Sequence, residues 1–164
     1  MSVLVASGLI VVATNQQALT TAYRHNPAFE DAELAKVGER ERAATDPRAT
    51  IAVMLAGNGP YFSHRRTIDL LGKSDRHIAR LRVPTTAFFR PGHVKVDLDY
   101  SIRRLRPDLV DLGLPISSAE QVAKFARWGY EPLPNGMLVR ADSTLVDRQR
   151  LGASSYLKGP AKAR

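Results

Sequence analysis

Apolar residues in this chain occur in short continuous runs that alternate with stretches of helical spacing. Residues 50–56 (TIAVMLA) form a β-branched, apolar run that ends at a Gly-Asn-Gly-Pro turn over residues 57–60, which predicts a buried strand. Residues 67–71 (TIDLL), which end at Gly72, and residues 108–114 (DLVDLGL) predict two further strands.

Two segments between these runs have the spacing of helices. Residues 30–44 place one face at positions i, i+3 and i+7, formed by Leu34, Val37 and Glu41. Residues 98–105 place Ile102 and Leu105 on one face, and Pro107 is expected to end that helix.

Capping residues mark two more helices. Ser74 or Asp75 can cap a short helix over residues 76–81, because either side chain can accept a hydrogen bond from a free N–H of the first turn. Ser117 and Glu120 have the spacing of a capping box, which predicts a helix that runs to about Trp128.

The C-terminal part of the pattern predicts a hairpin and completes the fold class. Gly129 supplies a left-handed cap, and a Pro-Asn-Gly turn separates residues 130–133 from residues 137–140, which are predicted to pair. Strands that alternate with helices predict an α/β fold with a mostly parallel sheet, in a small three-layer or two-layer sandwich preceded by a short apolar N-terminal segment.

The pattern divides the chain into three parts. We expect an apolar segment and linker over residues 1–24, an α/β domain over residues 25–151 and a flexible tail over residues 152–164. Residues 1–13 (MSVLVASGLIVVA) are uncharged, but they are fewer than the roughly 20 residues of a spanning helix. Three interpretations stay open for them: the end of a membrane helix, an interfacial anchor or a core strand.

The net charge of +8 is concentrated in the middle of the chain. Between residues 64 and 106 there are eleven basic and four acidic residues. Such a cluster attracts phosphate, nucleic acid or anionic lipid head groups, although a solvated arginine-rich surface has the same composition. The chain contains no Cys, which excludes disulfides, Cys-based metal sites and thiol nucleophiles.

Motifs for several other functions are incomplete. The Gly-Asn-Gly turn lacks the third glycine of a dinucleotide-binding turn, and the Pro-Tyr-Phe sequence after it predicts no following helix. The four His residues include no pair at i, i+4 spacing, so we expect neither a metal site nor a cofactor. Ser63, His93 and Asp97 can be drawn as a catalytic triad, but no nucleophile-elbow motif accompanies them.

Carboxylates and aromatic residues lie close together in the central segment. The carboxylates are Asp69, Asp75 and Asp97, and the aromatic residues are Tyr61, Phe62 and Tyr100. Carboxylate oxygens accept hydrogen bonds from sugar hydroxyls or serve general acid–base chemistry, while rings stack on the apolar face of a sugar. Helix caps and surface charges are the alternative role of the same carboxylates.

Four pieces of the chain resemble one known family. They are residues 60–79 (PYFSHRRTIDLLGKSDRHIA), residues 91–97 (PGHVKVD), Tyr100 and residues 106–108 (RPD). Together they resemble the C-terminal soluble part of bacterial multi-spanning glycosyltransferases of the GT-C type, which use polyprenyl-phosphate sugars. The arabinofuranosyl- and mannosyltransferase-like members of actinobacteria are nearest in kind, and the similarity covers about residues 30–140.

The resemblance implies an extracytoplasmic, membrane-associated location and a role in cell-envelope glycan synthesis. Members of that family place the catalytic aspartate and the lipid-phosphate site in the membrane-embedded region. We therefore expect this chain to be an accessory domain or a truncated fragment, with no catalytic residue and no activity alone. The implied partners are a glycan or polyprenyl-phosphate sugar head group and a membrane or membrane-embedded protein, whereas nucleic acid is not expected.

The resemblance also carries over candidate ligand-binding positions for glycan or phosphate, namely Arg66, Asp69, Lys73, Asp75, His93, Lys95, Asp97 and Tyr100. We expect these side chains to converge on one saccharide-facing surface beside a bilayer. Two alternative functions stay open: a free-standing anion- or nucleic-acid-binding α/β module, and a small hydrolase that uses Asp69, Asp97 and His93.

Overall fold

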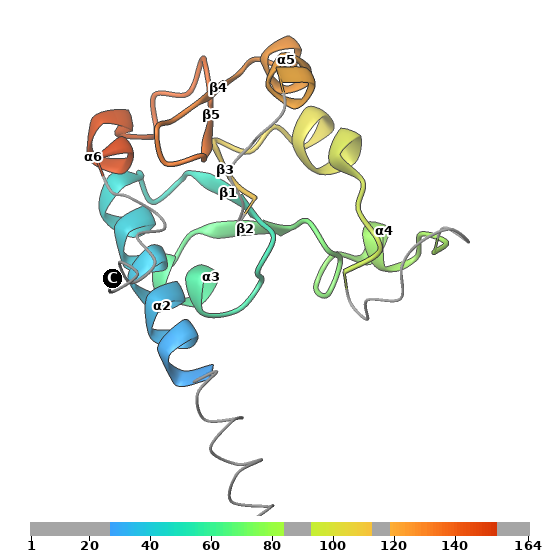
Figure 1. Cartoon of the computed structure of the whole chain (residues 1–164), viewed down its shortest axis with the longest axis horizontal. Coiled ribbons are helices and arrows are strands. Elements are labelled where there is room, and N and C mark those ends of the chain that lie inside the picture. The colour runs from blue at the N-terminus through green and yellow to red at the C-terminus, as the bar shows by residue number, and fades with distance from the viewer. Residues whose placement is uncertain (1–26, 84–92, 113–118, 154–164) are drawn as a thin grey trace, which may run out of the picture. The chain divides into compact units, whose positions relative to one another are not determined.

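The computed structural model describes residues 27–83, 93–112 and 119–153, which contain an α/β fold around a five-stranded sheet (Figure 1). The sheet and the helices packed on it belong to a compact unit that begins at Leu34. The predicted α/β class is confirmed. The apolar N-terminal segment and nearly all of the predicted tail lie outside the described residues, and none of the described helices has both the length and the apolar character to cross a bilayer.

The sheet is parallel in its first half and antiparallel in its second half. Its strands are β1 (Thr50–Val53), β2 (Arg66–Asp69), β3 (Leu109–Asp111), β4 (Tyr130–Pro132) and β5 (Leu138–Arg140). They lie in the order β2-β1-β3-β5-β4, with β1 parallel to β2 and β3, and with β5 antiparallel to β3 and β4. The three predicted strands and the predicted hairpin are all present, and Gly129 has the expected left-handed φ of 82° before β4.

The helical elements include one that the sequence did not predict. They are α2 (Pro27–Ala44), α3 (Asn58–Ser63), α4 (Arg76–Ala79), η1 (Asp99–Arg104), α5 (Ala119–Arg127) and α6 (Arg148–Gly152). The expectation that no helix follows the Gly-Asn-Gly turn is wrong, because α3 begins within that turn. Pro60 occupies the third position of α3, where a missing N–H costs no intrahelical hydrogen bond.

Helices cover both faces of the sheet and make three layers. One apolar cluster joins the sheet to α2 and α6 and includes Val37, Val53, Leu109 and Leu151. The other joins the sheet to η1 and α5 and includes Ile68, Ile102, Val110 and Phe125. Successive residues of β1 enter opposite clusters, as the alternation of side chains along a strand requires.

A glycine allows α2 and α3 to lie side by side (Figure 1). A Cβ atom at Gly38 would lie 2.2 Å from the carbonyl oxygen of Gly59 and 2.9 Å from the backbone nitrogen of Ser63. Both contacts are with backbone, so any side chain at Gly38 would push α3 away from α2.

The predicted helix over residues 98–105 is a π-helical turn. The N–H of Leu105 donates to the carbonyl oxygen of Tyr100 at 3.1 Å, a spacing of five residues. Ile102 is buried as predicted, but the prediction that Leu105 faces inward is wrong, because Leu105 is 40% exposed and Ser101 is buried instead. The wider turn takes residue i+3 off the face that an α-helix would give it.

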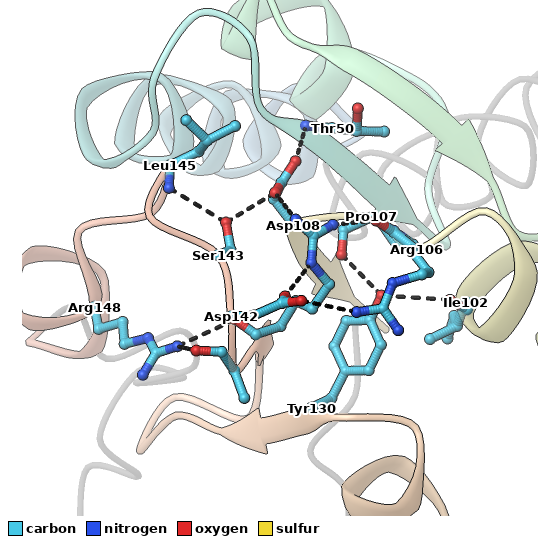
Figure 2. A network of polar contacts seen from close by, with 12 residues as sticks. Thr50, Ile102, Arg106, Pro107, Asp108, Tyr130, Asp142, Ser143, Leu145 and Arg148 are labelled. Atoms are coloured by element: carbon cyan, nitrogen blue, oxygen red, sulfur yellow. Dashed lines mark hydrogen bonds and ion pairs between the residues drawn. The ribbon is translucent and has the colours of Figure 1, made fainter.

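The carboxylate of Asp108 joins the two halves of the sheet (Figure 2). Its Oδ2 accepts a hydrogen bond from the N–H of Thr50, at the start of β1, at 2.8 Å. Its Oδ1 accepts one from the hydroxyl of Ser143 at 2.8 Å and lies 2.9 Å from the guanidinium of Arg140, at the end of β5. Asp108 itself is buried, so these charged contacts are shielded from water.

The residues before Asp108 are held by the same network. Arg106 has a left-handed φ of 50°, and its carbonyl oxygen accepts a hydrogen bond from Arg140. The Tyr130 hydroxyl lies between η1 and β3, where it contacts the carbonyl oxygens of Pro107 at 2.8 Å and Ile102 at 3.3 Å (Figure 2). Burial raises the pKa of Tyr130, so its hydroxyl keeps its proton and donates.

Replacement of Asp108 by Ala is expected to destabilise the fold by about 3–5 kcal/mol, because it removes the buried partner of Arg140 and leaves the N–H of Thr50 and the hydroxyl of Ser143 without their acceptor. Urea unfolding of the two proteins measures the difference. The matched control is Asp142→Ala, which removes the exposed partner of the same Arg140, a site where water can take over. Equal effects of the two substitutions would contradict the role assigned to Asp108.

Candidate functional site

Two helix caps bring α4 and η1 together. The Oδ1 of Asp75 accepts hydrogen bonds from the N–H groups of His77 at 2.8 Å and Ile78 at 3.0 Å, which caps α4 as the sequence predicted. The Oδ1 of Asp97 accepts one from the N–H of Tyr100 at 2.9 Å, at the start of η1. Each carboxylate keeps its second oxygen for a contact with the other helix.

Those second oxygens hold a stacked pair of rings. The Oδ2 of Asp97 lies 3.1 Å from Nε2 of His77, and the Oδ2 of Asp75 lies 3.4 Å from the hydroxyl of Tyr100. The two rings lie 4.0 Å apart between centroids and are tilted by 30°. The result is a reciprocal arrangement, in which each helix cap also fixes the aromatic ring of the opposite helix.

The hydrogen bonds at Asp97 keep it ionised. The backbone N–H of Tyr100 and, secondarily, the side chain of His77 lower the pKa of Asp97. An ionised carboxylate accepts hydrogen bonds and donates none. Asp97 is therefore suited to bind hydroxyl groups and is not suited to act as a general acid.

An open pocket of about 400 Å³ lies beside these rings. Its lining residues are His77, Asp97, Asp99, Tyr100, Arg103 and Arg104. Arg103 is paired with Asp99 at 3.3 Å. Arg104 is exposed, and its side chain has no ion pair or hydrogen bond with the described residues, which leaves it available to an anion.

The other positions taken from the resemblance do not line this pocket. Lys95 donates to the carbonyl oxygen of Ala79 at 2.5 Å and so holds the segment before η1 against the end of α4. Arg66 and Lys73 are exposed, and His93 is partly buried. The eight positions therefore do not all converge on one surface: Asp97 and Tyr100 line the pocket, and Asp75 contacts Tyr100.

The carboxylate of Asp69 is occupied by hydrogen bonds within the protein and is not open to a ligand. It is buried, and it accepts hydrogen bonds from the N–H groups of Leu71, Gly72 and Ser74 and from the Ser74 hydroxyl. These bonds shape the loop between β2 and α4, in which Gly72 has a left-handed φ of 73°. Asp69 therefore positions Asp75 through the loop.

The contacts of Ser63 and Asp97 do not support the catalytic triad that can be drawn from Ser63, His93 and Asp97. The Ser63 hydroxyl donates to the carbonyl oxygen of Pro60 at 3.0 Å, and Asp97 is paired with His77. Within residues 27–83, 93–112 and 119–153, no three His, Asp or Glu side chains gather in a way that would hold a metal ion.

Comparison of the chain with known families gives one match. The model of a domain of unknown function, DUF8728, matches residues 19–155. The chain belongs to the DUF8728 family. No curated protein and no solved structure matches the chain.

This DUF8728 domain also contains a buried acid, Glu41, outside the pocket. The sequence places Glu41 on the same face of α2 as Leu34 and Val37 but gives it no role. Glu41 is 1% exposed, and neither of its carboxyl oxygens has a hydrogen-bond partner among the described residues. Burial, together with the nearby charge of Asp111, raises the pKa of Glu41 from 4.5 to about 8. The only signal in the sequence was its i+7 spacing from Leu34 and i+4 spacing from Val37.

The raised pKa predicts that the DUF8728 domain loses stability as the pH rises. Glu41 binds a proton in the folded state up to about pH 8, whereas the unfolded chain releases it near pH 4.5. The wild type should therefore lose up to about 5 kcal/mol relative to Glu41→Gln as the pH rises from 4.5 to 8. Urea unfolding at both ends of that range, with a chelator present, measures this.

The control for this prediction is Glu39→Gln, which removes the same charge from an exposed position of α2. That variant should follow the pH dependence of the wild type. A wild type whose stability, relative to Glu41→Gln, is independent of pH would show that the Glu41 carboxyl is not buried as described.

Proposed function

We propose that this chain is an extracytoplasmic accessory domain of a membrane glycosyltransferase, acting in cell-envelope glycan synthesis. In this proposal it binds an acceptor glycan or the head group of a polyprenyl-phosphate sugar in the pocket between α4 and η1. The observation that carries the proposal is that Asp97 and Tyr100, two positions taken from the family resemblance, line one pocket.

The chemistry of the pocket fits a saccharide. Ionised Asp97 offers an acceptor for sugar hydroxyls, and Asp99 adds a second carboxylate. The stacked rings of His77 and Tyr100 offer an aromatic surface for the apolar face of a sugar. No covalent step is assigned to these residues, since their proposed role is to bind.

Arg104 extends this chemistry to a phosphate group. Its guanidinium has no partner among the described residues, and a charge-assisted, bidentate contact with phosphate is the strongest interaction that this pocket offers. A sugar with a phosphate group, as in a polyprenyl-phosphate sugar, would satisfy both the carboxylates and the arginine. We therefore favour a sugar phosphate over a neutral sugar as the ligand.

The proposal is tested by NMR titration of the ¹⁵N-labelled chain. The ligands are mannose 1-phosphate, arabinofuranose 1-phosphate and the corresponding neutral oligosaccharides. We expect chemical-shift changes confined to residues 75–79 and 97–104. Arg104→Gln should weaken sugar-phosphate binding about tenfold, as the loss of one charge-assisted hydrogen bond implies, and should leave neutral-sugar binding unchanged.

The matched control is Arg127→Gln, which removes an exposed arginine from α5 outside the pocket. It should bind like the wild type. An absence of shift changes with every ligand, or changes that fall outside the pocket, would contradict the proposal. Binding of random-sequence DNA with a steep dependence on salt would instead favour an anion- or nucleic-acid-binding module.

A further inference from the structure

The order of the strands makes a topological switch point at the carboxyl ends of β1 and β3. From β1 the chain moves to β2 on one side and then crosses to β3 on the other side, so the connections diverge between β1 and β3. In open α/β sheets, ligands bind at the carboxyl ends of the strands at such a switch point. Val53 and Asp111 are paired there, as the last residues of β1 and β3.

Two carboxylates meet at this point. Because Asp111 is in register with Val53, its side chain leaves the sheet on the face that Val53 shares with Val37 and Ala44 of α2. Glu41 lies between Val37 and Ala44 on the same inner face of α2. Burial and, secondarily, the nearby charge of Asp111 disfavour ionisation of Glu41.

Glu41 is a buried acid whose carboxyl oxygens have no protein partner among the described residues. Its two carboxyl oxygens are enclosed without a partner in the described part of the chain, although buried polar atoms are almost always hydrogen-bonded. A proton on Glu41 would remove its charge but would leave both oxygens without a partner. A cation would satisfy both oxygens and would cancel the repulsion from Asp111.

We propose that Glu41 and Asp111 form a binding site for Mg²⁺ at the carboxyl ends of β1 and β3. Carboxylate oxygens are hard ligands and select Mg²⁺ or Ca²⁺ over softer metals. Ca²⁺ takes six to eight oxygen ligands, whereas Mg²⁺ is commonly held by one or two carboxylates and keeps several waters. Two carboxylates match the small set of protein ligands that Mg²⁺ takes and fall short of the set that Ca²⁺ takes. Partly exposed Asp111 gives the ion its access to solvent.

Thermal unfolding of the full chain tests the site, with MgCl₂ added after removal of metals and with NaCl matched for ionic strength. Mg²⁺ should raise the Tm of the wild type and of Glu39→Gln, the exposed control on α2. The rise should vanish in Glu41→Gln, and Asp111→Asn should need at least about tenfold more Mg²⁺ for the same rise. Because Mg²⁺ displaces a proton, its apparent affinity should increase about tenfold per pH unit below the pKa of Glu41.

Three results would overturn the site: no Mg²⁺-dependent rise in the wild type, an equal rise in Glu41→Gln, or a rise with Ca²⁺ and none with Mg²⁺. If Mg²⁺ has no effect while Glu41→Gln still removes the pH dependence of stability, Glu41 binds a proton only and the proposal is wrong. The residues involved do not line the pocket between α4 and η1, so the result is independent of glycan binding.

Discussion

The carboxylate of Asp108 is the point at which the two halves of this sheet depend on each other. The first N–H of β1, in the parallel half, and the guanidinium of Arg140, in the antiparallel half, share this one buried carboxylate, while the other partner of Arg140, Asp142, is exposed. Removal of two charges from water is costly unless their hydrogen bonds are complete, and Ser143 completes those of Asp108. The seam of the sheet, which is the place where its parallel half meets its antiparallel half, is therefore held by polar contacts. The apolar clusters pack on either side of the sheet.

This seam also positions the pocket. The chain enters β3 directly from η1, and the Tyr130 hydroxyl, on β4, joins the end of η1 to the residue before Asp108. The π-helical turn is thereby anchored at its C-terminal end to the hairpin, while Asp97 fixes its N-terminal end and the ring of His77. The position of Tyr100 beside His77 follows from these two attachments.

Local rules sufficed for part of this structure, and contacts distant in sequence decided the rest. Asp75 as a cap and Gly129 as a left-handed terminus follow from a few neighbouring residues, and short apolar runs that end at turn residues predicted the strands. The exposure of Leu105 did not follow, because the i, i+3 spacing of Ile102 and Leu105 predicts an α-helical face, whereas the segment forms a wider π-helical turn. Nor did the burial of Asp69 or the lack of a hydrogen-bond partner at Glu41, since only tertiary neighbours determine whether a carboxylate faces solvent, backbone N–H groups or an apolar layer.

Hydrogen exchange at the amide of Thr50 tests the role of Asp108 most directly, since the acceptor of that amide is a side chain from across the seam. If the Asp108 carboxylate holds the two halves together, the Thr50 amide should exchange only when the whole sheet opens, at a rate within about tenfold of the slowest amides of β1 and β5. Exchange at the rate of an exposed loop, with the neighbouring amides of β1 still protected, would contradict the account.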